Sequence, residues 1–183
     1  MRLAQLRIKS LTLASMIEKI WLGVRSLAMT VLFPGTVAVY IPYRMLKPIN
    51  IQGPKIWSLT QYGALLVMGF GLVILFTCIW EFARFGRGTL SPFDEPRKLV
   101  IRGLYRYVRN PMYVGVALVL LGESCFFWSG RLLTYTGFCF IIANVLIMGY
   151  EEKRLRFKFG EEYERYREYV GRWIPGRPYE DSG

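Results

Sequence analysis

The chain has 183 residues, of which 53% are hydrophobic, 16% aromatic and 20% charged, and its formal net charge is +11. This apolar share excludes a disordered chain, and the three cysteines lie scattered in apolar runs, which excludes a disulfide framework or a zinc cluster. Because the sequence holds no histidine, catalytic triads, metal sites and general bases that need an imidazole are excluded. We therefore expect no metal. The charges avoid the long apolar stretches, so we attribute them to a membrane rather than to nucleic acid.

Four apolar stretches have about the length that crosses a bilayer. They are residues 20–43, 56–82, 111–128 and 132–150. A spanning helix needs about 20 residues, so the third stretch is at the short end of the range. We expect an all-α, polytopic membrane bundle of four transmembrane helices. Residues 1–55 form an N-terminal segment with the first helix, and residues 56–183 form the core. A soluble protein with buried helices is the alternative.

Basic residues predict the orientation of this bundle. Nineteen Lys and Arg residues lie before the first stretch, between the second and third, or after the fourth, whereas four lie on the other side. Basic residues concentrate on the cytoplasmic side of membrane proteins. We therefore expect both termini, and the two large polar segments 83–110 and 151–183, to be cytoplasmic. The compact size favours a prokaryotic plasma membrane.

The C-terminal segment predicts one amphipathic helix that ends at Pro175. Apolar residues recur there every three or four positions, at Leu155, Phe159, Tyr163, Tyr166, Val170 and Trp173. Such a helix either lies on the membrane surface or closes its aromatic face over the bundle as a lid.

The segment that enters the third stretch is rich in arginine and tyrosine. Asn110 followed by Pro111 predicts a helix start, with Asn110 as the cap. The free backbone amides of this helix start, with Arg106 and Arg109 beside it, would hold an anion such as a carboxylate. The same segment also contains three tyrosines, at Tyr105, Tyr107 and Tyr113.

Two adjacent acids, Glu151 and Glu152, follow the fourth stretch. Only three residues join the third and fourth stretches, so the two form a hairpin that brings these acids beside the helix start at Pro111. A zwitterionic ligand suits the pair of sites, and the amino-acid end of S-adenosylmethionine is such a group. Glu123 lies deep in the third stretch, where a carboxyl is costly, and Arg131 is one possible partner.

In this order, four motifs resemble the isoprenylcysteine carboxyl methyltransferase superfamily, over residues 90–175. They are Arg109-Asn-Pro-Met-Tyr113, Tyr150-Glu-Glu152, Phe159-Gly-x-Glu-Tyr-x-x-Tyr166 and Arg172-Trp-Ile-Pro175. Phospholipid N-methyltransferases of the same superfamily carry motifs similar to Asn110-Pro-Met-Tyr-x-Gly115 and Tyr150-Glu-Glu152. The resemblance implies a helical membrane methyltransferase that binds S-adenosylmethionine at the cytoplasmic face and takes a lipophilic or lipidated acceptor from the bilayer. The eukaryotic prenylcysteine enzymes have His where this chain has Asn110, so any contact that needs an imidazole is lost.

The expected site follows from these residues. The cofactor is expected to contact Tyr105, Arg109, Asn110, Pro111, Tyr113, Gly115, Glu151 and Glu152. Glu151 is the preferred partner of the ammonium. Glu151 or Glu152 can act as a base for an ammonium acceptor, and Arg154 or Arg172 can hold an acceptor carboxylate. Carboxyl O-methylation like that of the isoprenylcysteine enzymes is the favoured reaction. Phospholipid N-methylation, an NADPH-dependent membrane reductase and a non-enzymatic scaffold are the alternatives.

Overall fold

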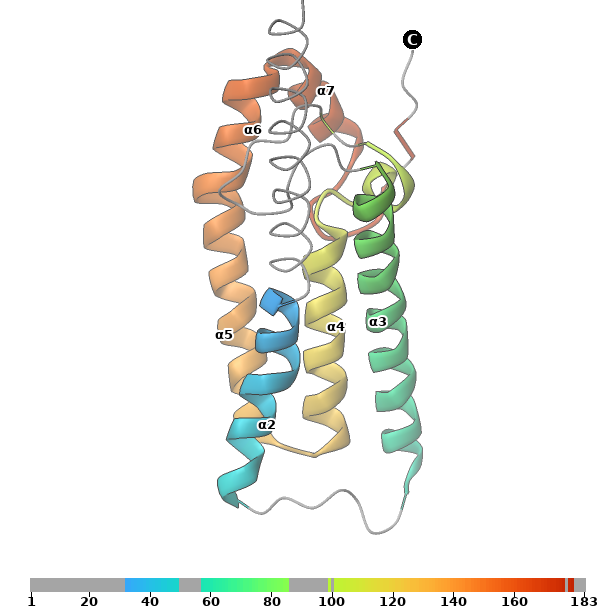
Figure 1. Cartoon of the computed structure of the whole chain (residues 1–183), viewed down its shortest axis with the longest axis vertical. Coiled ribbons are helices and arrows are strands. Elements are labelled where there is room, and N and C mark those ends of the chain that lie inside the picture. The colour runs from blue at the N-terminus through green and yellow to red at the C-terminus, as the bar shows by residue number, and fades with distance from the viewer. Residues whose placement is uncertain (1–31, 50–56, 86–98, 100, 177, 180–183) are drawn as a thin grey trace, which may run out of the picture.

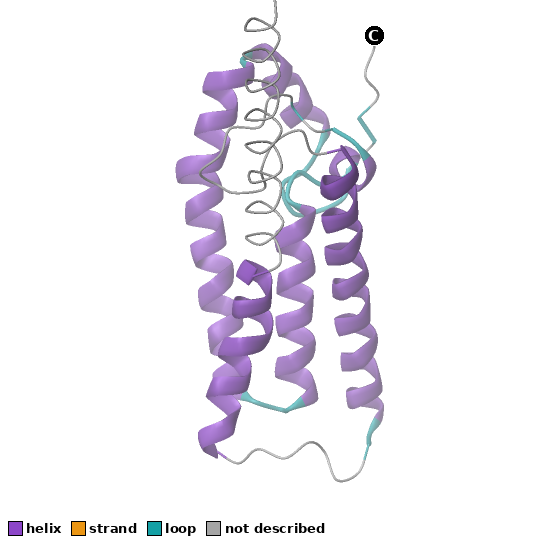
Figure 2. Ribbon diagram, in the orientation of Figure 1, coloured by secondary structure: helices purple, strands orange, loops and turns teal. Residues whose placement is uncertain are grey.

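The structure is a computed structural model that describes residues 32–49, 57–85, 99, 101–176, 178 and 179. The regular elements of these residues are all helices (Figures 1 and 2). They are η1 Thr36–Tyr40, α2 Ile41–Leu46, η2 Lys47–Ile49, α3 Leu59–Phe85, η3 Gly103–Arg106, α4 Pro111–Phe126, α5 Gly130–Leu146, η4 Ile147–Glu151, α6 Glu152–Phe159 and α7 Glu161–Tyr169. The all-α class is therefore confirmed.

Four helical segments lie roughly antiparallel in a bundle (Figure 1). Residues 32–49 run in one direction, α3 returns, α4 runs back, and α5 returns beside it. The predicted hairpin is present, because Ser129 alone separates the Phe127–Trp128 turn from α5, and its hydroxyl accepts a hydrogen bond from the amide of Leu132 at 3.4 Å. The helices η3, α6 and α7 gather at one end, which we call the polar end (residues 101–110 and 151–176).

Two of the helices are long and apolar enough to cross a membrane, Leu59–Glu81 and Gly130–Phe159, whereas Pro111–Phe126 is shorter. In the most apolar stretch of Leu59–Glu81, only 22% is buried inside the protein, and in that of Gly130–Phe159 only 17% is buried. A core helix of a soluble protein would be mostly buried, so these exposures favour contact with lipid. Part of the first predicted span, residues 20–31, lies outside the described residues.

The helices α3 and α4 pack closely because small residues face each other. A Cβ atom added at Gly115 would lie 2.9 Å from Leu75 Cγ and 3.0 Å from the carbonyl oxygen of Gly71. Both distances are shorter than van der Waals contacts allow. Gly115, predicted as a cofactor contact, therefore lies in the interface with α3, where it lets the two backbones approach.

The predicted single helix of the C-terminal segment is wrong in its bounds. The chain forms two helices, α6 and α7, which are separated by Gly160 with φ of +51° and ψ of −123°. The second helix ends at Tyr169, and residues 170–176 turn back. The predicted aromatic face instead packs on Leu99 and Ile101, in a cluster of Tyr163, Tyr166 and Val170 with Leu99, Ile101, Leu155, Phe159 and Tyr179.

Candidate functional site

The C-terminal segment is fastened to the chain just before α4. Val108 and Gly171 form a single parallel β-bridge, and the amide of Arg109 donates to the carbonyl of Gly171 at 2.9 Å. The amide of Gly176 donates to the carbonyl of Tyr107 at 3.0 Å. These bonds place residues 171–173 beside the start of α4.

Two arginines meet on one buried carboxylate. Arg172 donates from Nε to Glu152 Oε1 at 2.7 Å and from Nη2 to Oε2 at 2.9 Å, and this pairing raises the pKa of Arg172. Nη1 of Arg109 lies 3.1 Å from the same Oε1, and only 9% of the Glu152 side chain is exposed. Bidentate arginine–carboxylate pairs are geometrically specific. This ion-pair cluster therefore joins α6, the start of α4 and the C-terminal segment.

Arg109 keeps hydrogen-bonding capacity for a further anion. Its side chain is only 10% exposed, yet Nε and Nη1 lack a partner with hydrogen-bond geometry. The guanidinium also lies near Tyr163, where it opposes the rise that burial causes in the pKa of that hydroxyl. Buried donors without acceptors are costly, so a ligand carboxylate at this place fits the residues present.

Asn110 does not cap α4 with its side chain, contrary to the prediction. Its Nδ2 instead donates to the carbonyl of Arg172, at a long 3.5 Å. Pro111 does occupy the first helical position, as predicted, and is buried. The first amides of α4 therefore have no side-chain cap from Asn110, which leaves the helix start free for an anion.

Glu151 is bound to α4 rather than to an arginine. The hydroxyl of Tyr113 donates to Glu151 Oε1 at 2.5 Å. Glu151 ends the π-helical turn η4, whereas Glu152 begins α6. The two adjacent acids thus have different partners, one a tyrosine and the other a pair of arginines.

Two further residues predicted for the site, Tyr105 and Arg154, have different contacts. The carbonyl of Tyr105 accepts a hydrogen bond from the hydroxyl of Tyr166 at 2.6 Å. Burial raises the pKa of both tyrosines, and Glu151 is close enough to contribute to the shift of Tyr105. Arg154 on α6 contacts Tyr150, one turn earlier in η4, with Nη1 at 3.2 Å from the hydroxyl. These contacts therefore bring Tyr105 close to Glu151 and Arg154 close to Tyr150.

Glu123 lies apart from the polar end. Its Oε2 is buried without a hydrogen-bond partner, and the predicted ion pair with Arg131 is not formed.

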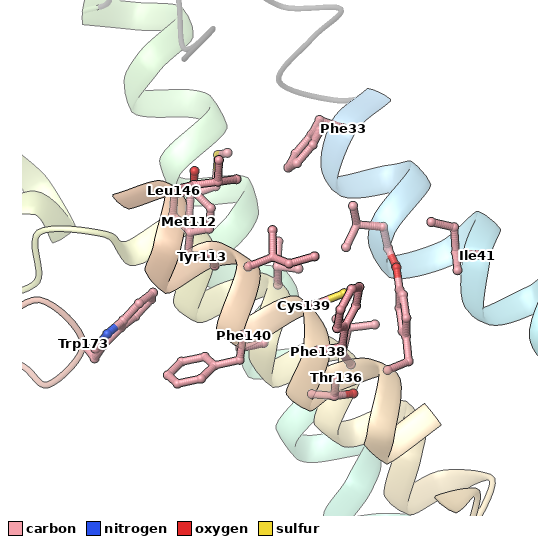
Figure 3. Close-up of a pocket in the computed structure, with 17 residues that line it drawn as sticks. Phe33, Ile41, Met112, Tyr113, Thr136, Phe138, Cys139, Phe140, Leu146 and Trp173 are labelled. Atoms are coloured by element: carbon pink, nitrogen blue, oxygen red, sulfur yellow. The ribbon is translucent and has the colours of Figure 1, made fainter. Parts of the chain in front are cut away.

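An apolar cavity of about 280 Å³ extends from Tyr113 and Trp173, next to the polar end, and runs between α4, α5 and residues 33–41 (Figure 3). Two of its lining residues lead to the polar end. The hydroxyl of Tyr113 donates to Glu151, and Trp173 follows Arg172 in the chain. Its other lining residues are Phe33, Val37, Ile41, Met112, Val116, Ala117, Leu120, Tyr135, Thr136, Phe138, Cys139, Phe140, Ile142, Ala143 and Leu146. None of the described lining residues is charged.

The cavity could not be predicted from the sequence. Its residues come from four separate segments, and their apolar side chains are indistinguishable in the sequence from those that face lipid. Trp173 was visible in the aromatic pattern of the C-terminal segment, but its partner Asn144 was not, because nothing near Asn144 in the sequence marks it. The indole Nε1 of Trp173 donates to Asn144 Oδ1 at 3.1 Å.

Comparison with known proteins relates the chain to membrane methyltransferases. The family model described as phospholipid methyltransferase matches residues 59–162. A methanethiol S-methyltransferase of a Pseudomonas species is 32% identical over 136 residues, which are 70% of this chain and 50% of that protein. One from Crocosphaera subtropica is 31% identical over 157 residues, or 77% and 58% of the two chains.

The chain thus spans about half the length of these curated relatives, and no solved structure matches it. The family match extends from α3 into α7, and includes Arg109, Tyr113, Glu151 and Glu152. It covers more than half of the chain. The chain therefore belongs to the phospholipid methyltransferase family.

Proposed function

We propose that the chain is a methyltransferase that uses S-adenosylmethionine and methylates a small apolar acceptor, with a thiol as the acceptor group. One observation carries this proposal: the apolar cavity is bordered by Tyr113, whose hydroxyl donates to Glu151, and by Trp173, which follows Arg172 in the chain. A charged ligand at the polar end and an apolar ligand in the cavity would therefore touch each other. Contact between a methyl donor and a methyl acceptor is the main requirement of this reaction.

The residues at the polar end fit the amino-acid group of the cofactor. The unpartnered donors of Arg109 suit its carboxylate. Glu151, whose Oε1 is held by Tyr113, suits its ammonium. Glu152 is already paired with two arginines, so we assign it to positioning Arg109 and Arg172 rather than to binding or to acting as a base. When bound, S-adenosylmethionine supplies the methyl group as an electrophile on a sulfonium sulfur.

The cavity favours an acceptor without a permanent charge. A carboxylate or ammonium in a cavity without charged lining residues would be poorly stabilised. The arginines predicted to hold an acceptor carboxylate are otherwise engaged, because Arg172 binds Glu152 and Arg154 contacts Tyr150. The similar proteins named methanethiol S-methyltransferase act on a thiol, which agrees with this choice.

Carboxyl O-methylation of the isoprenylcysteine type therefore becomes a second candidate. Phospholipid N-methylation is a third, which the description of the family favours. In all three reactions the chain would hold the acceptor in the cavity and exclude water from the point of contact beside Tyr113. A neutral thiol already carries lone pairs on its sulfur, so it can attack the methyl carbon and lose its proton to water afterwards, whereas an ammonium has no lone pair until a base removes a proton.

We also propose that the polar end faces the cytoplasm of a prokaryotic plasma membrane. The basic side chains of the C-terminal segment lie at that end, where Lys153, Arg154 and Arg156 belong to α6, beyond the apolar helix α5. This placement would give the site access to a water-soluble cofactor and would open the cavity toward lipid-soluble acceptors.

Binding and turnover on detergent-purified protein test the proposal. We expect saturable binding of radiolabelled S-adenosylmethionine, no binding of NADPH, and methylation of butanethiol in preference to butanoate or phosphatidylethanolamine. Binding of NADPH alone would identify a reductase. Binding of neither ligand would contradict an enzymatic function of this site.

Cys139 provides a direct probe of the cavity. It borders the cavity, whereas Cys78 is fully buried and Cys125 is exposed elsewhere on α4. In a Cys125→Ser background, a small maleimide should label Cys139, and butyl methyl sulfide, the methylated product, should slow that labelling. Labelling that is indifferent to the sulfide would place the acceptor outside the cavity.

A further inference from the structure

Three aromatic side chains meet at the end of the cavity that lies next to the polar end. The ring of Trp173 has its centroid 5.0 Å from that of Phe140 and 6.5 Å from that of Tyr113. All three rings border the cavity, and Figure 3 shows them near one another, apart from Phe33 and Ile41. We call these three residues the aromatic end of the cavity.

The aromatic end is held in place from both sides. Trp173 is fixed by its hydrogen bond to Asn144 on α5, and its neighbour Arg172 is fixed by the bidentate pair with Glu152. Tyr113 is fixed by the bond from its hydroxyl to Glu151. Rings positioned in this way form a wall of defined shape rather than a mobile surface.

Tyr113 connects two environments through a single side chain. Its hydroxyl reaches the carboxylate of Glu151, while its ring borders the apolar cavity. A ligand with its ammonium on Glu151 must therefore run along the ring of Tyr113 to enter the cavity. In S-adenosylmethionine, two methylene groups separate the amino-bearing carbon from the sulfonium sulfur, so the sulfur would follow the ammonium toward the rings.

A positive charge at that position needs a partner other than a carboxylate, because none of the described residues that line the cavity is acidic. Aromatic rings attract cations through their negative faces, and tryptophan does so most strongly. Cations that carry methyl groups suit such rings best, because they are weakly hydrated. The sulfonium is a cation of this kind.

We propose that Trp173, with Phe140 and Tyr113, forms a cation–π subsite for the sulfonium of the methyl donor. This inference rests on the proposed binding of S-adenosylmethionine. The subsite would hold the methyl group at the mouth of the acceptor cavity. After transfer the donor sulfur is a neutral thioether, so the subsite would bind S-adenosylhomocysteine without this attraction and favour its release.

The test compares the affinities of Trp173→Leu for S-adenosylmethionine and S-adenosylhomocysteine by isothermal titration calorimetry on the full chain. The two ligands differ in the methyl group and its charge. We expect about a tenfold weaker affinity for the charged ligand and little change for the neutral one. Trp128→Leu, in the exposed turn between α4 and α5, is the matched control and should change neither affinity. Equal weakening for both ligands would reduce Trp173 to a structural residue and overturn the inference.

A second measurement avoids any disturbance of the C-terminal segment. Fluorinated tryptophans placed at position 173 keep the shape of the ring but weaken its negative face. The affinity for S-adenosylmethionine should fall stepwise with the number of fluorine atoms, while the affinity for S-adenosylhomocysteine should stay constant. A flat response for both would reject the cation–π subsite and leave the proposed function intact. Wild-type protein that binds neither ligand would instead reject the proposed function itself.

Discussion

At the scale of single residues, Glu152 is expected to matter more for stability than any other acid of the polar end. Glu152→Gln leaves the nearly buried Arg109 and the partly exposed Arg172 without their common counter-charge. Removal of one partner from a buried ion pair costs about 3 kcal/mol of the free energy of unfolding. Thermal unfolding in detergent measures the loss, with the exposed Glu168→Gln as the control. Equal unfolding midpoints for the two variants would contradict the structural role of Glu152.

Glu151, the neighbouring acid, is expected to act on ligand binding instead. Glu151→Gln keeps the shape and a hydrogen-bond acceptor for Tyr113 but removes the charge that suits the ammonium. A charge-assisted hydrogen bond contributes about 1.5–3 kcal/mol, which is roughly tenfold to a hundredfold in affinity. Both S-adenosylmethionine and S-adenosylhomocysteine carry the ammonium, so calorimetry should show parallel losses. Unchanged affinities would move the ammonium site away from Glu151.

The different partners of these two acids mark the limit of prediction from sequence at this scale. The short hairpin loop was enough to predict that both lie near the start of α4. The binding of Glu152 to Arg172 depends on the chain reversal after Tyr169 and on the bridge between Val108 and Gly171. Such a long-range pairing leaves no periodic signal in the sequence. The capping role predicted for Asn110 failed for the same reason, because the carbonyl of Arg172 lies within its reach.

At the scale of elements, Gly160 decides how the C-terminal segment folds. Its backbone, at φ +51° and ψ −123°, lies in a region that residues with a Cβ atom rarely adopt. Gly160→Ala should therefore cost about 1–3 kcal/mol of the free energy of unfolding, although open space surrounds the added Cβ. Gly137→Ala, in the middle of α5 and also in open space, should leave the unfolding midpoint unchanged or slightly raised. If the two variants behave alike, the turn at Gly160 is not constrained as the structure indicates.

The elements themselves follow from sequence to different degrees. The bounds of α3, α4 and α5 agree within a few residues with the predicted spans, because long apolar runs between polar segments leave few alternatives. The break at Gly160 was missed, since the apolar pattern from Leu155 to Trp173 continues through it. Up to Val170 that pattern reflects packing on Leu99 and Ile101, and its last member, Trp173, borders the cavity, so the pattern does not mark a single helix face.

At the scale of the whole molecule, the structure gathers the polar end, residues 101–110 and 151–176, at one end of the bundle (Figure 1). This arrangement follows from an even number of crossings between its two parts, the helices α4 and α5, which the hydropathy of the chain already indicates. What the sequence does not provide is the cavity between α4, α5 and residues 33–41. Its volume depends on the tilts and separations of helices whose lipid-facing and cavity-facing residues are equally apolar.

The orientation of the bundle is the prediction that belongs to this scale. Nineteen basic residues flank one side and four the other, so fusions after Gly183 and fusions between Arg44 and Lys55 should report opposite sides of the membrane. Alkaline phosphatase, which is active only outside the cytoplasm, should be inactive at Gly183 and active in the loop; green fluorescent protein should give the reverse. An outward C-terminal fusion would place Arg109, Glu151 and the mouth of the cavity outside the cell. Because S-adenosylmethionine is made in the cytoplasm, that result would overturn the proposed cofactor together with the topology.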